Sequence, residues 1–136
     1  MDFRYTPHEQ QFRLEVRRFI AEHCPCELKG FHEIHAEHVP LEMAFLKRMA
    51  AKGWLGAAFP QEYGGLGGER APMAEYILID ELHHADLEGV AVTLTYIVGI
   101  IGNTLLQVGS EELKKEFLPR MLNAERSTLF LNDEKT

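Results

Sequence analysis

The chain has 136 residues, 46% of them hydrophobic and 26% charged, and its formal net charge is −7. This composition is typical of a folded soluble domain and excludes a disordered tail or a collagen-like fibre. The length suits one hydrophobic core, and the acidic balance argues against general nucleic-acid binding, which needs a basic surface.

The first predicted helix begins at a capping box formed by Thr6 and Glu9 and ends near His23. A second helix begins at Pro40 and ends before Gly53, a natural residue just beyond a helix end. The apolar faces of these two helices are Phe12, Val16, Phe19 and Ile20 in the first, and Leu41, Phe45, Leu46 and Met49 in the second.

Residues 54–70 are predicted as a loop, because glycines and Pro60 interrupt any helical period. A third helix begins near Ala71 and Pro72. Its apolar stripe consists of Ala74, Ile77, Leu78, Leu82 and Ala85.

Residues 89–110 carry no charge and are apolar enough to raise the question of a membrane span. Polar residues within this run and the lack of a flanking basic cluster argue against a span. We expect instead a helix buried on most of its faces and broken near Gly102 and Asn103. Ser110 then caps an amphipathic helix with acidic residues in its first turn. The expected inner face of this last helix, before Pro119, is Leu113, Phe117 and Leu118.

These elements predict an all-α fold of about five or six helices around one core. Residues 128–131 are rich in strand-forming side chains and could start a β-strand, but no second strand is available to pair with it. The pattern suggests a chain that stops before its next domain. Cys24 and Cys26, one residue apart, rarely reach disulfide geometry. A reducing compartment and the lack of an N-terminal signal segment predict a cytoplasmic protein.

Three groups of residues could carry chemistry. The first group lies within residues 23–38 and contains thiolates and imidazoles, which are the preferred zinc ligands. On a helix, the direction from His32 through His35 to His38 would turn by about 240°, so we favour a polar connector over a metal site. The glycine-rich residues 59–68 could hold a phosphate, yet they lack the P-loop pattern, and a tight structural loop is favoured. His83 and His84 are adjacent and point about 100° apart on a helix, so they cannot serve one site. The potential zinc ligands are His23, Cys24, Cys26, His32, His35 and His38.

Two further motifs are GWLGAAFPQEYGGLG at residues 53–67 and GSEELKKEFLP at residues 109–119. In this order they resemble the N-terminal domain of the acyl-CoA dehydrogenase family. The opening Phe3-x-Tyr5-Thr6-Pro7 and the third helix fit as well. The resemblance implies that residues 1–125 are this helical domain and that residues 126–136 are the truncated start of a flavin-binding β-domain.

In that family a carboxylate of the C-terminal domain removes the α-proton of an acyl-CoA thioester, a hydride passes to FAD, and an electron-transfer flavoprotein takes the electrons. The resemblance therefore implies an oxidoreductase of fatty-acid β-oxidation that is a homo- or hetero-oligomer in its full-length form. No catalytic residue falls within this chain. We expect the chain alone to be inactive, because it covers only the first of the family's domains.

The resemblance also implies site residues. Tyr96 should limit the depth of the acyl pocket. At the end of the chain, Glu134 alone matches the family's flavin motif, because Asn132 and Lys135 stand where the motif has an aromatic residue and a proline. The implied substrate-binding residues are Thr93, Tyr96, Ile97 and Ile100. A different interpretation is a non-catalytic helical module that pairs with a partner subunit. The acyl group, whether fatty, branched or steroid-derived, is not determined by the sequence.

Overall fold

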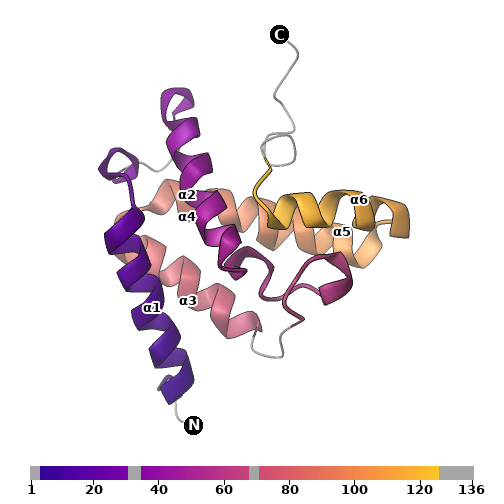
Figure 1. Cartoon of the computed structure of the whole chain (residues 1–136), viewed down its shortest axis with the longest axis horizontal. Coiled ribbons are helices and arrows are strands. Elements are labelled where there is room, and N and C mark those ends of the chain that lie inside the picture. Colours follow the sequence, from indigo (N-terminus) through magenta and orange to yellow (C-terminus); the bar gives the residue numbers. More distant parts are fainter. Residues whose placement is uncertain (1–3, 31–34, 68–70, 126–136) are drawn as a thin grey trace.

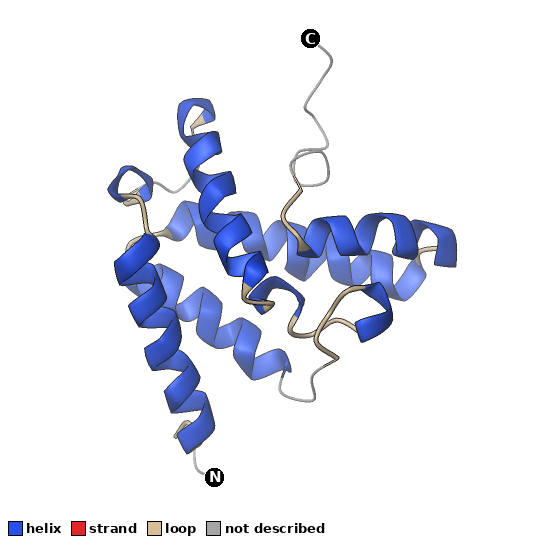
Figure 2. Ribbon diagram, in the orientation of Figure 1, coloured by secondary structure: helices blue, strands red, loops and turns tan. Residues whose placement is uncertain are grey.

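The computed structural model describes residues 4–30, 35–67 and 71–125, and in this part every regular element is a helix or a helical turn (Figures 1 and 2). The all-α prediction is therefore confirmed for these residues, whereas the predicted strand at 128–131 lies outside them. The helices are α1 (Pro7–His23), α2 (Val39–Ala51), α3 (Ala71–His84), α4 (Glu88–Leu94), the π-helix η5 (Thr95–Gly102), α5 (Asn103–Val108) and α6 (Glu111–Leu122). Short 3₁₀ turns lie at η1 (Cys26–Leu28), η2 (Ala36–His38), η3 (Trp54–Gly56) and η4 (Gln61–Tyr63).

The first helix starts and ends where the sequence predicts. The side chain of Thr6 accepts a hydrogen bond from the backbone N–H of Glu9 at 3.2 Å, and the Glu9 carboxylate accepts one from the N–H of Thr6 at 2.8 Å. Cys24 leaves α1 in an extended conformation, as the residue before a proline prefers. α1 then packs along α3, and the two helices run side by side in Figure 1.

One apolar core joins all the longer helices, and an aromatic cluster forms part of it. Phe19 of α1 lies 4.9 Å from the Trp54 ring and 5.7 Å from the Phe45 ring of α2. Gly53 adopts the left-handed conformation, with φ of 77°, and so turns the chain from α2 into the loop that carries Trp54. The predicted end of α2 is confirmed, as is the loop after it over the described residues 54–67.

The three segments α4, η5 and α5 form one continuous helix, Glu88–Val108, which we call the long helix. The expected break near Gly102 and Asn103 is wrong, because both residues keep right-handed helical backbone angles and only the winding changes there, from π to α. The expectation of burial on most faces is also wrong, since only 39% of its most apolar stretch is buried. None of the described elements covers the remaining face.

The long helix is the single helix, among the described residues, that is long and apolar enough to cross a membrane. A core helix of a soluble protein meets the same criteria, so this feature is a weak indication of a membrane span.

The last helix begins where expected, but its buried residues lie further along it than expected. Ser110 caps it as predicted, accepting a hydrogen bond from the N–H of Leu113. Leu113 itself is 44% exposed rather than part of the inner face, and the helix continues through Pro119 for another turn. The residues that α6 buries are Leu118, Met121 and Leu122.

Candidate functional site

The four predicted substrate-binding residues divide between two sides of the long helix. Tyr96 and Ile100 are 59% and 50% exposed, and they lie on the uncovered side. Ile97 is only 6% exposed and belongs to the core, and Thr93, one turn before it, lies against α2 beside Glu42. The structure thus brings Tyr96 and Ile100 together on an accessible surface and turns Thr93 and Ile97 away from it.

A fifth residue, Ile101, shares the uncovered side with Tyr96 and Ile100 and is 41% exposed. We call these three side chains the outer face. The sequence pattern did not reveal Ile101, because α-helical spacing would place it elsewhere. The one available signal was the pair of glycines, Gly99 and Gly102, which are unusual inside a helix.

Three polar side chains of the long helix are hydrogen-bonded within the helix itself. The hydroxyl of Thr93 donates to the carbonyl of Gly89 at 3.1 Å, and that of Thr95 donates to Ala91 at 2.8 Å. The side-chain amide of Asn103 donates to the carbonyl of Gly99 at 2.9 Å, within the helix as well. The three side chains of the outer face are apolar apart from the Tyr96 hydroxyl, which suits an apolar ligand.

A carboxyl group is buried beneath this helix. Glu42 of α2 is fully buried, and neither of its side-chain oxygens has a hydrogen-bond partner among the described residues. Burial raises the pKa of Glu42, an effect that the nearby Thr93 hydroxyl partly opposes. That hydroxyl donates to Gly89 instead, so we regard Glu42 as an unpaired buried acid.

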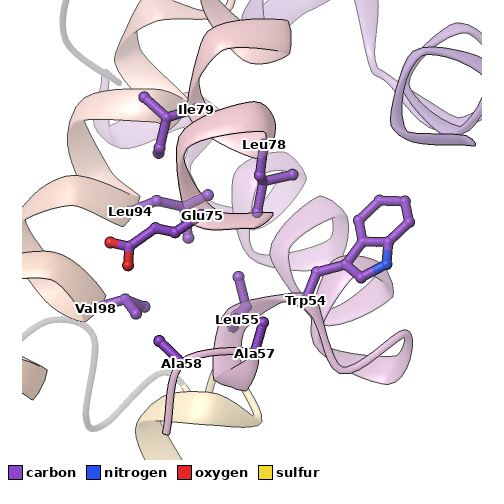
Figure 3. Close-up of a pocket in the computed structure, with 9 residues that line it drawn as sticks. All are labelled: Trp54, Leu55, Ala57, Ala58, Glu75, Leu78, Ile79, Leu94 and Val98. Carbon is purple, nitrogen blue, oxygen red and sulfur yellow. The ribbon is translucent and has the colours of Figure 1, made fainter. Parts of the chain in front are cut away.

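A small apolar pocket lies between the loop after α2, helix α3 and the inner side of the long helix (Figure 3). Its volume is about 20 Å³, which is room for about one water molecule and far too small for an acyl chain. Glu75 reaches from α3 toward the long helix, as Figure 3 shows, and is the one charged residue that lines it. None of the four predicted site residues contributes to this pocket. The full lining is Trp54, Leu55, Ala57, Ala58, Glu75, Leu78, Ile79, Leu94 and Val98.

The glycine-rich loop is structural, as the sequence favours. Its backbone N–H groups at residues 64–67 all donate to carbonyls within the loop, at 2.8 to 3.0 Å, so none is free to bind a phosphate. Gly65 is required by packing, since a Cβ atom there would lie 2.0 Å from the carbonyl oxygen of Phe59. The loop in turn presses the Phe59 ring against Gly102 at the end of the π-helix.

The bonded N–H groups of the glycine-rich loop also concern the binding of a flavin. A flavin dinucleotide carries phosphates, which proteins usually hold with free backbone N–H groups or cations. The N–H groups at residues 64–67 offer no such cradle, and Glu134, the predicted flavin contact, lies outside the described residues. These four N–H groups therefore supply no phosphate site for FAD.

The possible zinc ligands do not form a metal site in the described part of the chain. No group of three or more histidine, cysteine, aspartate or glutamate side chains lies close enough there to hold an ion, and His32 lies outside that part. Cys26 is exposed, whereas Cys24 is half-buried and its pKa is raised by that burial.

The two motifs that carry the family resemblance meet in space. Tyr63 of the first motif donates its hydroxyl to Glu111 of the second at 2.8 Å, and a Cβ atom at Gly64 would lie 3.7 Å from Pro119. The carboxylate bond raises the pKa of Tyr63 to about 12 and lowers that of Glu111. The motifs therefore act together as a clamp between the loop and α6.

The family model described as the acyl-CoA dehydrogenase N-terminal domain matches residues 6–125. The chain belongs to the acyl-CoA dehydrogenase family. It is 36% identical over 120 residues to acyl-CoA dehydrogenase FadE29 of Mycobacterium tuberculosis, covering 88% of this chain and 29% of that protein. It is 32% identical over 127 residues to a glutaryl-CoA dehydrogenase of Desulfococcus multivorans, covering 92% of this chain and 31% of that one.

Solved structures of the acyl-CoA dehydrogenase family agree with the fold. The ChsE4–ChsE5 complex of Mycobacterium tuberculosis superposes with a TM-score of 0.68 at 27% identity, over 91% of this chain and 30% of the matched chain. A structure described as the Tcur3481–Tcur3483 steroid ACAD superposes with a TM-score of 0.70 at 31% identity, over 91% of this chain and 31% of the matched chain. The chain thus spans between 29% and 31% of the length of these four proteins and corresponds to their N-terminal part.

Proposed function

We propose that this chain is the N-terminal domain of an FAD-dependent acyl-CoA dehydrogenase and that its long helix forms one wall of the acyl site. The observation that carries the proposal is the outer face, in which Tyr96 and Ile100 stand exposed on a helix whose Thr93, Thr95 and Asn103 side chains are bonded internally. An isolated domain rarely leaves such side chains exposed together without a ligand or partner to cover them.

The reaction divides its tasks among domains. The flavin supplies the hydride acceptor in this family, and we infer that it is held by segments outside the described residues, with Glu134 as this chain's candidate contact. The base that removes the α-proton also lies outside them. The part of the outer face is to bind the acyl chain and exclude water from it, which strengthens the base and protects the intermediate from solvent.

The charge of the site favours an apolar acyl group. The long helix has one charged residue, Glu88 at its start, so no cation on it can pair with the second carboxylate of a substrate such as glutaryl-CoA. The likeness to a structure described as a steroid ACAD, at 31% identity, supports a steroid-derived chain among the apolar acyl groups. We infer that the substrate is a monocarboxylic acyl-CoA.

The partners follow from the same likeness. Both structural neighbours carry two protein names, which supports an oligomer of like or unlike chains. An electron-transfer flavoprotein is the proposed electron acceptor, and the cytoplasm the proposed location. The same two-protein neighbours support the second candidate function, a helical module whose outer face packs on a partner subunit without taking part in catalysis.

The test uses a complete enzyme that contains this domain, with dye reduction by acyl-CoA as the readout. Tyr96→Ala should raise kcat/KM for bulky acyl-CoA relative to linear acyl-CoA by about tenfold, because it deepens an apolar wall. The matched control, Tyr5→Ala, removes a tyrosine that packs under Arg13 near the start of α1 and should leave the ratio unchanged. A colourless protein that oxidises no acyl-CoA would favour the helical module.

A further inference from the structure

The winding of the long helix decides which of its side chains share a face. In an α-helix each residue turns by about 100°, so residues five apart point about 140° away from each other. In a π-helix each N–H bonds to the carbonyl five residues earlier, so residues five apart lie nearly one above the other. Tyr96 and Ile101 are five apart and both lie within the π-helix, Thr95–Gly102.

The exposures match the π winding. Ile97 and Val98 are each 6% exposed and define the side that faces the core. With about 100° per residue, Ile101 would point between these two directions and would be buried with them. It is instead 41% exposed, beside Tyr96. The π winding therefore moves one large apolar side chain from the core side to the outer face.

Two contacts hold the helix in this form. Gly102 faces the Phe59 ring, and a Cβ atom there would lie 3.0 Å from Phe59 and 3.3 Å from the carbonyl oxygen of Ile97. The Asn103 amide binds the Gly99 carbonyl, which lies within the π-helix, at 2.9 Å. The glycine-rich loop thus supports the segment that presents Ile101, although it binds no ligand itself.

We propose that Ile101 is a further specificity-determining residue of the acyl site and that the π winding puts it there. This inference rests on the proposed function. Ile101 widens the wall begun by Tyr96 and Ile100, and the occupant of that wall is the acyl chain of the thioester. A side chain with no polar atom can contribute only shape and apolar area, so Ile101 acts on the size of the acyl group accepted.

The placement of Ile101 can be tested on this chain without any activity. In a background in which both native cysteines are replaced by serine, Ile101→Cys should react with a thiol reagent about as fast as Tyr96→Cys. It should react at least about tenfold faster than Ile97→Cys, because reaction requires exposure. Rates in denaturant provide the reference for each variant. Protection of Ile101→Cys equal to that of Ile97→Cys would overturn the inference.

The specificity role is tested in the complete enzyme. Ile101→Ala should raise kcat/KM for bulky over linear acyl-CoA by about tenfold, whereas Leu14→Ala, an aliphatic change at 44% exposure on α1, should not. If Tyr96→Ala shifts the ratio and Ile101→Ala does not, this inference fails and the proposed function stands. If the unmodified enzyme oxidises no acyl-CoA, the proposed function and the specificity role fail together, and the thiol rates still decide the winding.

Discussion

Arg17 and Glu81 form a two-point ion pair that joins α1 to α3. Nε of Arg17 donates to one carboxylate oxygen of Glu81 at 2.9 Å, and Nη2 donates to the other at 2.8 Å. Arg13, one turn earlier on α1, adds a third bond at 3.0 Å. The Glu81 side chain is only 2% exposed, so its charge is balanced almost wholly by these two arginines. The pair thereby specifies how α1 sits along α3.

Replacing Glu81 should destabilise the fold. Glu81→Ala should lower the free energy of unfolding by about 2 kcal/mol, because three charged hydrogen bonds are lost. The loss is not larger because the half-exposed Arg17 can be hydrated instead. Urea denaturation at pH 7 measures the change. Glu15→Ala, which removes the exposed partner of Lys52, is the control and should cost less than about 1 kcal/mol.

The same pair predicts a pH dependence. The hydrogen bond from Arg17, together with the bond from Arg13 and the charges of both arginines, holds the pKa of Glu81 below its usual value of 4.5 although burial opposes this shift. Its contribution is therefore present above that value and is lost as the pH falls through the lower folded-state pKa. The difference in unfolding free energy between the native chain and Glu81→Gln should shrink in acid. A difference that stays constant with pH would contradict this account.

The stability linked to Glu42 should depend on pH in the opposite direction to that of Glu81. Burial raises its pKa in the folded chain above the usual value of 4.5, so the stability linked to its neutral form is present below that value and is lost as the pH rises through the folded-state pKa. Glu42→Leu should therefore stabilise the chain at pH 7 by about 1–3 kcal/mol, and the gain should shrink in acid. Glu116→Leu, at an exposed position of α6, is the control. An equal gain at every pH would show that ionisation of Glu42 is not the cause.

Gly65 should tolerate no side chain. A Cβ atom at this position would overlap the carbonyl oxygen of Phe59 at 2.0 Å, and backbone would have to move. Gly65→Ala should cost more than about 3 kcal/mol or prevent folding, as measured by thermal unfolding. Gly99→Ala is the matched control, because its Cβ would make an ordinary 3.5 Å contact with Glu75. Similar melting temperatures for both variants would contradict the packing assigned to Gly65.

The clamp between the two family motifs can be measured through one phenol. Tyr63 donates to Glu111, and this bond together with burial raises the pKa of Tyr63 to about 12. Tyr63→Phe should lower stability by about 1–2 kcal/mol and remove the highest tyrosine titration step seen by ultraviolet absorbance. Glu111→Gln should keep that step but move it to lower pH, because the acceptor loses its charge. A titration unchanged by Glu111→Gln would rule out the clamp.

Local sequence signals predicted the helix boundaries well. The Thr6–Glu9 capping box, Gly53 after α2 and Ser110 before α6 each occupy their expected place, because a cap depends only on a few neighbouring residues. Leu113 was misplaced, because its exposure depends on how far the start of α6 extends past the core rather than on its position in the helix.

The long helix shows where local signals stop. Its apolar composition was visible in the sequence, and from composition alone we expected burial on most sides. Which sides are covered depends on the elements packed against it, and none of the described ones reaches the outer face. Its π winding is likewise tied to the contact between Gly102 and Phe59, which are far apart in the chain.

The sequence by itself determined the family, the all-α class and the ends of most helices, since motifs, composition and caps are properties of short segments. Only the tertiary structure decided that Thr93 and Ile97 turn inward while Tyr96, Ile100 and Ile101 turn outward. The direction of a side chain depends on helix winding and on the neighbours that cover it, and distant parts of the chain set both.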